Sequence, residues 1–148
     1  EYSLKALKLH KDALEKIHGQ DSNYNFKNML LASNLAGKAI NITRTSIAHS
    51  ISYPLTAKYR IPHGLACSFT IPRILKFASE DIVLNKNIYL LEEVSYLLNK
   101  LQLPEKIRDY LDNDKFEIPY EDFVSKRSEN FIFKTNEKNI RDFINLNT

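Results

Sequence analysis

Two of the four histidines in this chain lie at the ends of one short stretch, HSISYPLTAKYRIPH, which covers residues 49–63. Neutral imidazole is the commonest metal ligand in proteins, so His49 and His63 point first to metal binding. His63 stands between a proline and a glycine, where proline restricts the backbone and glycine lets a ligand approach. Fourteen positions with Pro54 between them are enough for the chain to bend and bring both rings to one ion. The alternative is that both histidines are ordinary polar residues near a helix break.

The elements that must position these side chains are predicted to be helices. Residues 25–47 are apolar on nearly every side, with small residues among them, which is typical of a buried central helix. Other helices are predicted at residues 2–18, 64–79, 81–103, 105–113 and 136–146. No alternating strand pattern of useful length occurs. We therefore predict an all-α fold, a helical bundle in which residues 1–148 form one domain.

The composition narrows the class of protein. The chain has 148 residues, is 43% hydrophobic and 26% charged, and holds only three glycines, which favours a globular helical domain. Its 21 basic and 18 acidic residues are interspersed, so we expect no nucleic-acid partner. No run approaches the roughly 18 apolar residues of a membrane span. With a single cysteine, Cys67, no internal disulfide can form, and we expect a cytoplasmic protein without membrane association.

The longer run around both histidines, LASNLAGKAINITRTSIAHSISYPLTAKYRIPHGLACSFTIPRIL, resembles the signature region of the iron-containing (group III) alcohol dehydrogenases. The matching positions are His49, Pro54, Leu55, Tyr59, Pro62, His63, Gly64 and Pro72. The resemblance is specific over about residues 31–75 and rests on helix order alone elsewhere. It implies the helical C-terminal domain of that family, with His49 and His63 as two of its metal ligands.

The resemblance also implies a chemistry. Members of the family transfer a hydride reversibly between a nicotinamide and an aldehyde/alcohol pair, and a divalent metal polarises the carbonyl. We expect Fe2+ here, with Zn2+ as the alternative. The family commonly has another active-site histidine four residues after the first ligand, where this chain has Tyr53. A phenol can donate, accept and relay a proton, so Tyr53 is our candidate catalytic residue. Tyr53 and the AGKAIN run at 36–41 resemble the phosphonoacetaldehyde-reductase-like branch.

Lys38 is the predicted substrate-binding residue. If one helix runs from residue 25 to the histidine, eleven steps of about 100° leave Lys38 only about 20° from the direction of His49. Lys38 would then meet an anionic group of the substrate, such as a phosphonate, phosphate or carboxylate. The alternative is that its stem packs while its ammonium group reaches water. Other cations are alternative anion partners: Arg44, Lys58 and Arg60.

Parts of the family's site are not found in this sequence. The resemblance implies an aspartate and a histidine of an Asp-x-x-x-His turn as further ligands, upstream of Glu1. No phosphate-cradling loop can be assembled from three glycines, so NAD or NADP would be bound mainly by an N-terminal domain that is absent. The chain also starts with Glu1 inside a helical pattern. We therefore expect a fragment of a longer enzyme, inactive by itself.

Two other classes of protein stay open. One is a metal-dependent lyase or synthase of the dehydroquinate-synthase-like branch, which shares the two-histidine arrangement. The other is a stand-alone helical interaction module whose histidines are structural. The expected partner is a small aldehyde or alcohol, and a homodimer is left open as the oligomeric state.

Overall fold

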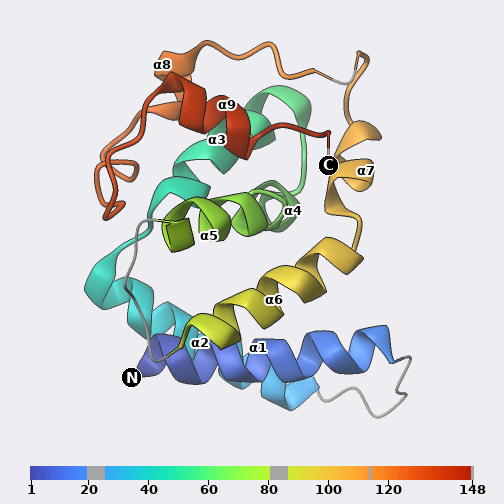
Figure 1. Cartoon of the computed structure of the whole chain (residues 1–148), viewed down its shortest axis with the longest axis vertical. Helices are drawn as coiled ribbons and strands as arrows, with labels where there is room; N and C mark the ends of the chain where they lie inside the picture. The colour runs from blue at the N-terminus through green and yellow to red at the C-terminus, as the bar shows by residue number, and fades with distance from the viewer. Residues whose placement is uncertain (20–25, 81–86, 114, 148) are drawn as a thin grey trace.

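The computed structural model describes residues 1–19, 26–80, 87–113 and 115–147, and within these ranges the regular elements are all helices (Figure 1). They are α1 (Tyr2–His18), α2 (Phe26–Thr43), α3 (Ile47–Tyr59), α4 (His63–Ser68), α5 (Ile71–Glu80), α6 (Ile88–Lys100), α7 (Leu103–Arg108), α8 (Tyr120–Phe123) and α9 (Glu137–Phe143). The predicted all-α helical bundle is confirmed. Among the helices described, none combines the length and the apolar character needed to cross a bilayer.

Helices α1 and α2 pack side by side at one end of the molecule (Figure 1). Lys38 near the end of α2 lies over the ring of Tyr2 at the start of α1, with Nζ 5.7 Å from the ring centre, so the helices run antiparallel. The residues that α1 and α2 bury are the small Ala6, Ala13 and Ala32. Small side chains let two helices approach closely, but they bury little apolar surface.

Helix α6 connects this pair to the rest of the fold. The His18 ring donates a hydrogen bond from Nε2 to the carbonyl oxygen of Leu97 at 2.9 Å. Lys11 Nζ lies 3.4 Å from a carboxylate oxygen of Glu93. On its other side α6 packs against α5. The contacts between α1 and α6 are therefore partly polar.

The main hydrophobic core lies at the other end of the molecule and is built from residues of α3 and later elements. Its buried members are Ile47, Ala48, Ile51, Leu55, Ile61, Ala66, Phe69, Ile74, Leu103, Ile107, Ile118, Phe123, Ile140, Phe143, Ile144 and Leu146. The last six come from the C-terminal segment 116–147, which wraps back over α3 and α5 (Figure 1). This segment therefore forms part of the core around α3.

The prediction of one helix over 25–47 is wrong at its C-terminal end. Helix α2 stops at Thr43, and Arg44 takes the left-handed backbone conformation with φ 64°. The three residues 44–46 are not helical, and α3 starts a new helix at Ile47. A non-glycine residue with positive φ cannot continue a right-handed helix, so the direction of the chain changes there.

The predicted burial of 25–47 is also wrong. Phe26, Leu30 and Ile42 expose 73%, 71% and 72% of their surface. Helix α1 covers one side of α2, and in the described part of the chain no other element covers the opposite side. An apolar sequence on all faces predicts burial only where partners surround the helix.

Three of the other predicted helices differ clearly in their limits, and one of them, predicted at 105–113, is observed as α7, Leu103–Arg108. Residues 64–79 form two helices, α4 and α5, and Pro72 is the second residue of α5, where proline is tolerated because its missing N–H has no intrahelical partner. The start of the predicted helix 81–103, with Leu84, lies outside the described residues. The short α8 was not predicted.

Candidate metal centre

The two histidines come from the starts of consecutive helices. His49 lies in the first turn of α3, and His63 is the first residue of α4. Arg60 ends α3 with a left-handed backbone, φ 59°, and the chain then turns so that α4 packs beside α3. Next to His63, a Cβ at Gly64 would meet no atom within 4 Å, so the space there is open. Both imidazoles are therefore carried on regular backbone.

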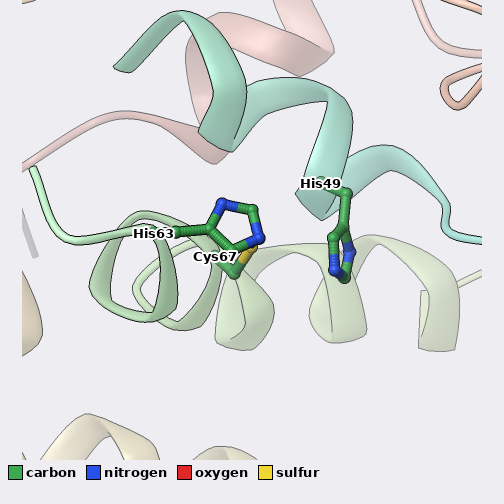
Figure 2. Close-up of side chains that lie close together, drawn as sticks. All are labelled: His49, His63 and Cys67. Atoms are coloured by element: carbon green, nitrogen blue, oxygen red, sulfur yellow. The ribbon is translucent and has the colours of Figure 1, made fainter. Parts of the chain in front are cut away.

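The rings meet between the two helices. The ring centres of His49 and His63 lie 5.4 Å apart, with their planes at 60° (Figure 2). Cys67 follows His63 by four positions on α4, so both side chains share one helix face. The donor atoms of His49, His63 and Cys67 all lie within 4.8 Å of one another, and Cys67 Sγ is 3.8 Å from His63 Nε2. Two nitrogens and one sulfur thus converge on one point.

A buried serine orients His63. The Ser52 hydroxyl donates to the carbonyl oxygen of His49 at 2.9 Å. Its oxygen, Oγ, also lies 3.2 Å from Nδ1 of His63. Because a hydroxyl has one hydrogen, Ser52 accepts from Nδ1–H, so Nε2 of His63 is the unprotonated nitrogen and faces the Cys67 thiol. Metal-binding histidines in proteins are commonly held in this way through their second nitrogen.

The electrostatic setting favours neutral imidazole. Burial lowers the pKa of His49 below its ordinary value, and the nearby charges of His63 and Arg127 lower it further. Burial raises the pKa of the Cys67 thiol, although the Ser52 hydroxyl partly opposes this. His49 is thus kept in the form that binds metal, whereas Cys67 would lose its proton on binding a metal.

Tyr53 lies beside the cluster formed by His49, His63 and Cys67. It follows His49 by one helical turn, and its ring centre is 5.3 Å from that of His63. The side chain is 45% exposed, so a molecule in solution can reach the phenol. The guanidinium of Arg127 lies over the Tyr53 ring, with Cζ 4.6 Å from the ring centre. His49, His63 and Tyr53, which the sequence predicted as site residues, therefore lie together.

Lys38 does not lie with them. Its ammonium group lies over Tyr2, in the α1–α2 pair, because the break at Arg44 redirects the chain before His49. The inference that Lys38 and His49 lie on the same face of one helix was therefore wrong. Substrate binding by Lys38 stays a prediction. Of the alternative cations, Lys58 donates to the carbonyl oxygen of Glu117, and Arg44 and Arg60 are exposed at helix ends.

Two residues near the histidines were missed from the sequence. Cys67 had a local signal, since it lies in the predicted helix 64–79 and follows His63 by four positions, about one helical turn. Arg127 had none, because it stands far along the chain from Tyr53 and reaches the site only when the C-terminal segment packs on α3.

Comparisons with known proteins identify the family of this chain. The family model described as Fe-containing alcohol dehydrogenase family, C-terminal, matches residues 1–113. A phosphonoacetaldehyde reductase from Streptomyces viridochromogenes (strain DSM 40736 / JCM 4977 / BCRC 1201 / Tue 494) is 44% identical over 46 residues, which are 31% of this chain and 12% of that protein. No solved structure matches significantly. Since the family model covers more than half of the residues, the chain belongs to the Fe-containing alcohol dehydrogenase family and carries its helical C-terminal domain.

Proposed function

We propose that this chain is the metal-binding helical part of a NAD(P)-dependent alcohol dehydrogenase or aldehyde reductase, with His49 and His63 as metal ligands. The observation that carries the proposal is the convergence of the two imidazoles from α3 and α4, with ring centres 5.4 Å apart. Membership of the family supports it, because the two histidines match that family's signature region. We keep the prediction that residues 1–148 act as one domain of a larger enzyme.

The side chains present fit a divalent ion. Imidazole nitrogen and thiolate sulfur are both ligands of Zn2+, and imidazole also binds iron. In tetrahedral zinc sites neighbouring donor atoms lie about 3.5 Å apart. Cys67 Sγ and His63 Nε2, at 3.8 Å, are close to this spacing, and side-chain rotation can bring in His49. His49 and His63 would hold the ion, with Cys67 as a further donor from this chain. Fe2+ is the ion expected from the family, and Zn2+ is the alternative.

Each residue near the histidines has a proposed part in the reaction. A bound divalent ion would act as a Lewis acid toward an aldehyde oxygen. Ser52 keeps Nε2 of His63 available by accepting from Nδ1–H. The Tyr53 phenol, half-exposed beside His63, would give or take the proton of the alcohol oxygen. The hydride would come from NAD or NADP, bound mainly by a nucleotide-binding domain of the intact enzyme.

The proposed substrate is a small aldehyde with an anionic group. The name of the relative from Streptomyces viridochromogenes supports this choice, since phosphonoacetaldehyde is a two-carbon aldehyde with a phosphonate. That match spans only 12% of the relative's length, so the proposed substrate is the class of small anionic aldehydes and not one compound. A homodimer stays a prediction.

A second candidate function is a helical interaction module. The exposed apolar side chains of α2, among them Leu30 and Ile42, favour it, because such residues often mark a contact surface. An interaction module would keep its function when the histidines are replaced.

Metal titration tests the proposed function. Isothermal titration of the chain with Zn2+ and Co2+ should show binding with a dissociation constant of about 1 μM or weaker, because few donors come from these residues. His63→Ala should abolish it, and because His63 is exposed, the substitution should leave the fold intact. His10→Ala, which removes a half-buried histidine of α1, is the matched control. Equal binding by wild type and His63→Ala would contradict the proposal.

A further inference from the structure

Arg127 lies on the connection after α8, which is hydrogen-bonded at its first end to α3 and at its second end to residues just before α3. At the first end, the buried Ser50 hydroxyl of α3 donates to the carbonyl oxygen of Phe123 at 2.5 Å. The Ser50 oxygen also lies 2.7 Å from the hydroxyl of Ser125, two residues before Arg127. Ser128 closes the turn, since its hydroxyl donates to the Ser125 carbonyl at 2.6 Å. The backbone before Arg127 is therefore held against α3, and Ser128 closes the turn that contains Arg127.

At the second end, Asn130 joins the connection to the segment before α3. Its side-chain amide donates to the carbonyl oxygens of Thr43 and Thr45, at 2.7 and 3.1 Å. Thr43 is the last residue of α2, and Thr45 lies in the break between α2 and α3. The same break that separates Lys38 from the site therefore anchors the segment that brings Arg127 to it.

The guanidinium of Arg127 is open to a ligand. Its Cζ lies over the Tyr53 ring in a cation–π contact, and the residue is exposed. Among the described residues, no carboxylate forms an ion pair with Arg127 and no acceptor takes a hydrogen bond from its side chain. By contrast, Arg141 pairs with Glu137 and donates to the Ile118 carbonyl, and Arg73 donates to the Asn147 carbonyl. Those arginines have structural partners in the fold.

Arg127 is a neighbour of Tyr53, and Tyr53 is a neighbour of His63. The guanidinium carbon is 4.6 Å from the Tyr53 ring centre, and that ring is 5.3 Å from the ring of His63. A small molecule with an oxygen at the histidines can therefore extend past the phenol toward Arg127.

We propose that Arg127 is a specificity-determining residue that binds the anionic group of the substrate, a phosphonate, phosphate or carboxylate, while the aldehyde end lies at His49 and His63. This inference rests on the proposed function. A guanidinium presents parallel N–H donors that match the oxygens of such an anion, and it stays charged at every relevant pH. Arg127 thus takes the role that the sequence assigned to Lys38.

A binding experiment on the 148-residue chain tests the proposal without catalysis. Methylphosphonate is titrated in low salt without metal, and backbone and arginine side-chain resonances are followed by NMR. Wild type should show saturable shifts centred on Arg127 and Tyr53. Arg127→Gln should weaken binding at least about tenfold, since a charged hydrogen-bonding partner is lost. Arg127→Lys should give an intermediate value, because it keeps the charge but not the paired donors.

Lys126→Gln is the matched control, because it removes the same charge from the neighbouring exposed position. It should change the affinity less than about twofold, which is the effect of screened charge alone. The proposal is overturned if wild type gives no saturable shifts, if Lys126→Gln weakens binding as much as Arg127→Gln, or if Lys38→Gln removes the binding instead.

A parallel Co2+ titration separates the two proposals. Cobalt binding that depends on His63, together with methylphosphonate binding that ignores Arg127, would overturn this inference and leave the proposed function standing. Methylphosphonate binding that depends on Arg127, without any metal binding in wild type, would overturn the proposed function instead.

Discussion

Helices α2 and α3 follow each other along the chain, and both are rich in apolar residues, yet they are buried very differently. Helix α2 buries only Ala32, and its larger apolar side chains are partly or largely exposed. Helix α3 buries Ile47, Ala48, Ser50, Ile51, Ser52 and Leu55. The difference lies in their neighbours. Helix α3 packs against α4, α8 and the C-terminal segment, whereas α2 packs mainly on α1.

The comparison shows why the candidate chemistry belongs to α3. A metal site needs side chains held in fixed positions by surrounding packing and hydrogen bonds. In α3 the buried Ser52 orients His63, and the buried Ser50 holds the connection that carries Arg127. Helix α2 has one packed side and contributes no residue to this site.

The largest expected effect is on stability, and it compares one leucine in each helix. Leu55 of α3 is fully buried, and Leu30 of α2 is 71% exposed. Leu55→Ala should lower the free energy of unfolding by about 2–5 kcal/mol, because it removes buried methyl groups and leaves a cavity. Leu30→Ala should change it by less than about 0.5 kcal/mol. Urea denaturation measures both.

A large loss in the free energy of unfolding for Leu30→Ala would contradict the difference in burial between α2 and α3. Such a loss would mean that the outer side of α2 is covered in solution. The dependence of unfolding on protein concentration would then show whether a second copy of the chain covers it, since dimer stability rises with concentration.

A smaller loss is expected from the buried hydrogen bond of Ser50. Ser50→Ala leaves the buried Phe123 carbonyl without this donor, so the free energy of unfolding should fall by about 1–3 kcal/mol. The matched control is Ser33→Ala on exposed α2, which should be neutral or slightly stabilising because alanine is the better helix former. If Ser50→Ala is as harmless as the control, the bond does not hold the C-terminal segment on α3.

The next effect concerns the sulfur donor at the α3–α4 site. With Co2+ bound, the chain should show a near-ultraviolet sulfur-to-cobalt charge-transfer band, and Cys67 is the one cysteine able to produce it. Cys67→Ser should remove the band and weaken Co2+ binding about tenfold, equivalent to about 1.4 kcal/mol. A wild-type cobalt complex without the band would exclude Cys67 as a ligand and leave the histidines as donors.

The smallest effect is a pH dependence from His49 of α3, for which α2 has no counterpart because it contains no histidine. Burial lowers the pKa of His49, so on acidification the unfolded chain takes up this proton before the folded chain does. The folded state should therefore lose stability as the pH falls through the ordinary histidine pKa of about 6.5, and the loss should level off below the folded pKa.

His49→Gln should lack this part of the pH dependence, and NMR titration of the ring should give a pKa below the ordinary value. Arg127→Gln should move the pKa of His49 upward, because one of the charges that lower it is removed. A measured pKa at or above the ordinary histidine value would show that the ring is more solvated than its place in α3 indicates.

Local patterns in the sequence were enough to predict the fold class and the proximity of His49 and His63. Apolar spacing predicted α1 at residues 2–18, as observed, because helix periodicity is a property of neighbouring residues. The His49 and His63 signature lies within one continuous stretch, so it could be matched without knowing the fold. The two rings then meet because α3 and α4 are joined by a short turn.

The tertiary structure alone decided the break at Arg44, the different burial of α2 and α3, and the arrival of Arg127. An apolar pattern says which side chains avoid water, but it does not say how many of their faces other helices will cover. The predicted position of Lys38 failed for this reason, since it assumed that one helix continued into the core. Arg127 reaches Tyr53 through Ser50, Phe123 and Asn130, contacts between distant parts of the chain that form only when the C-terminal segment packs on α3.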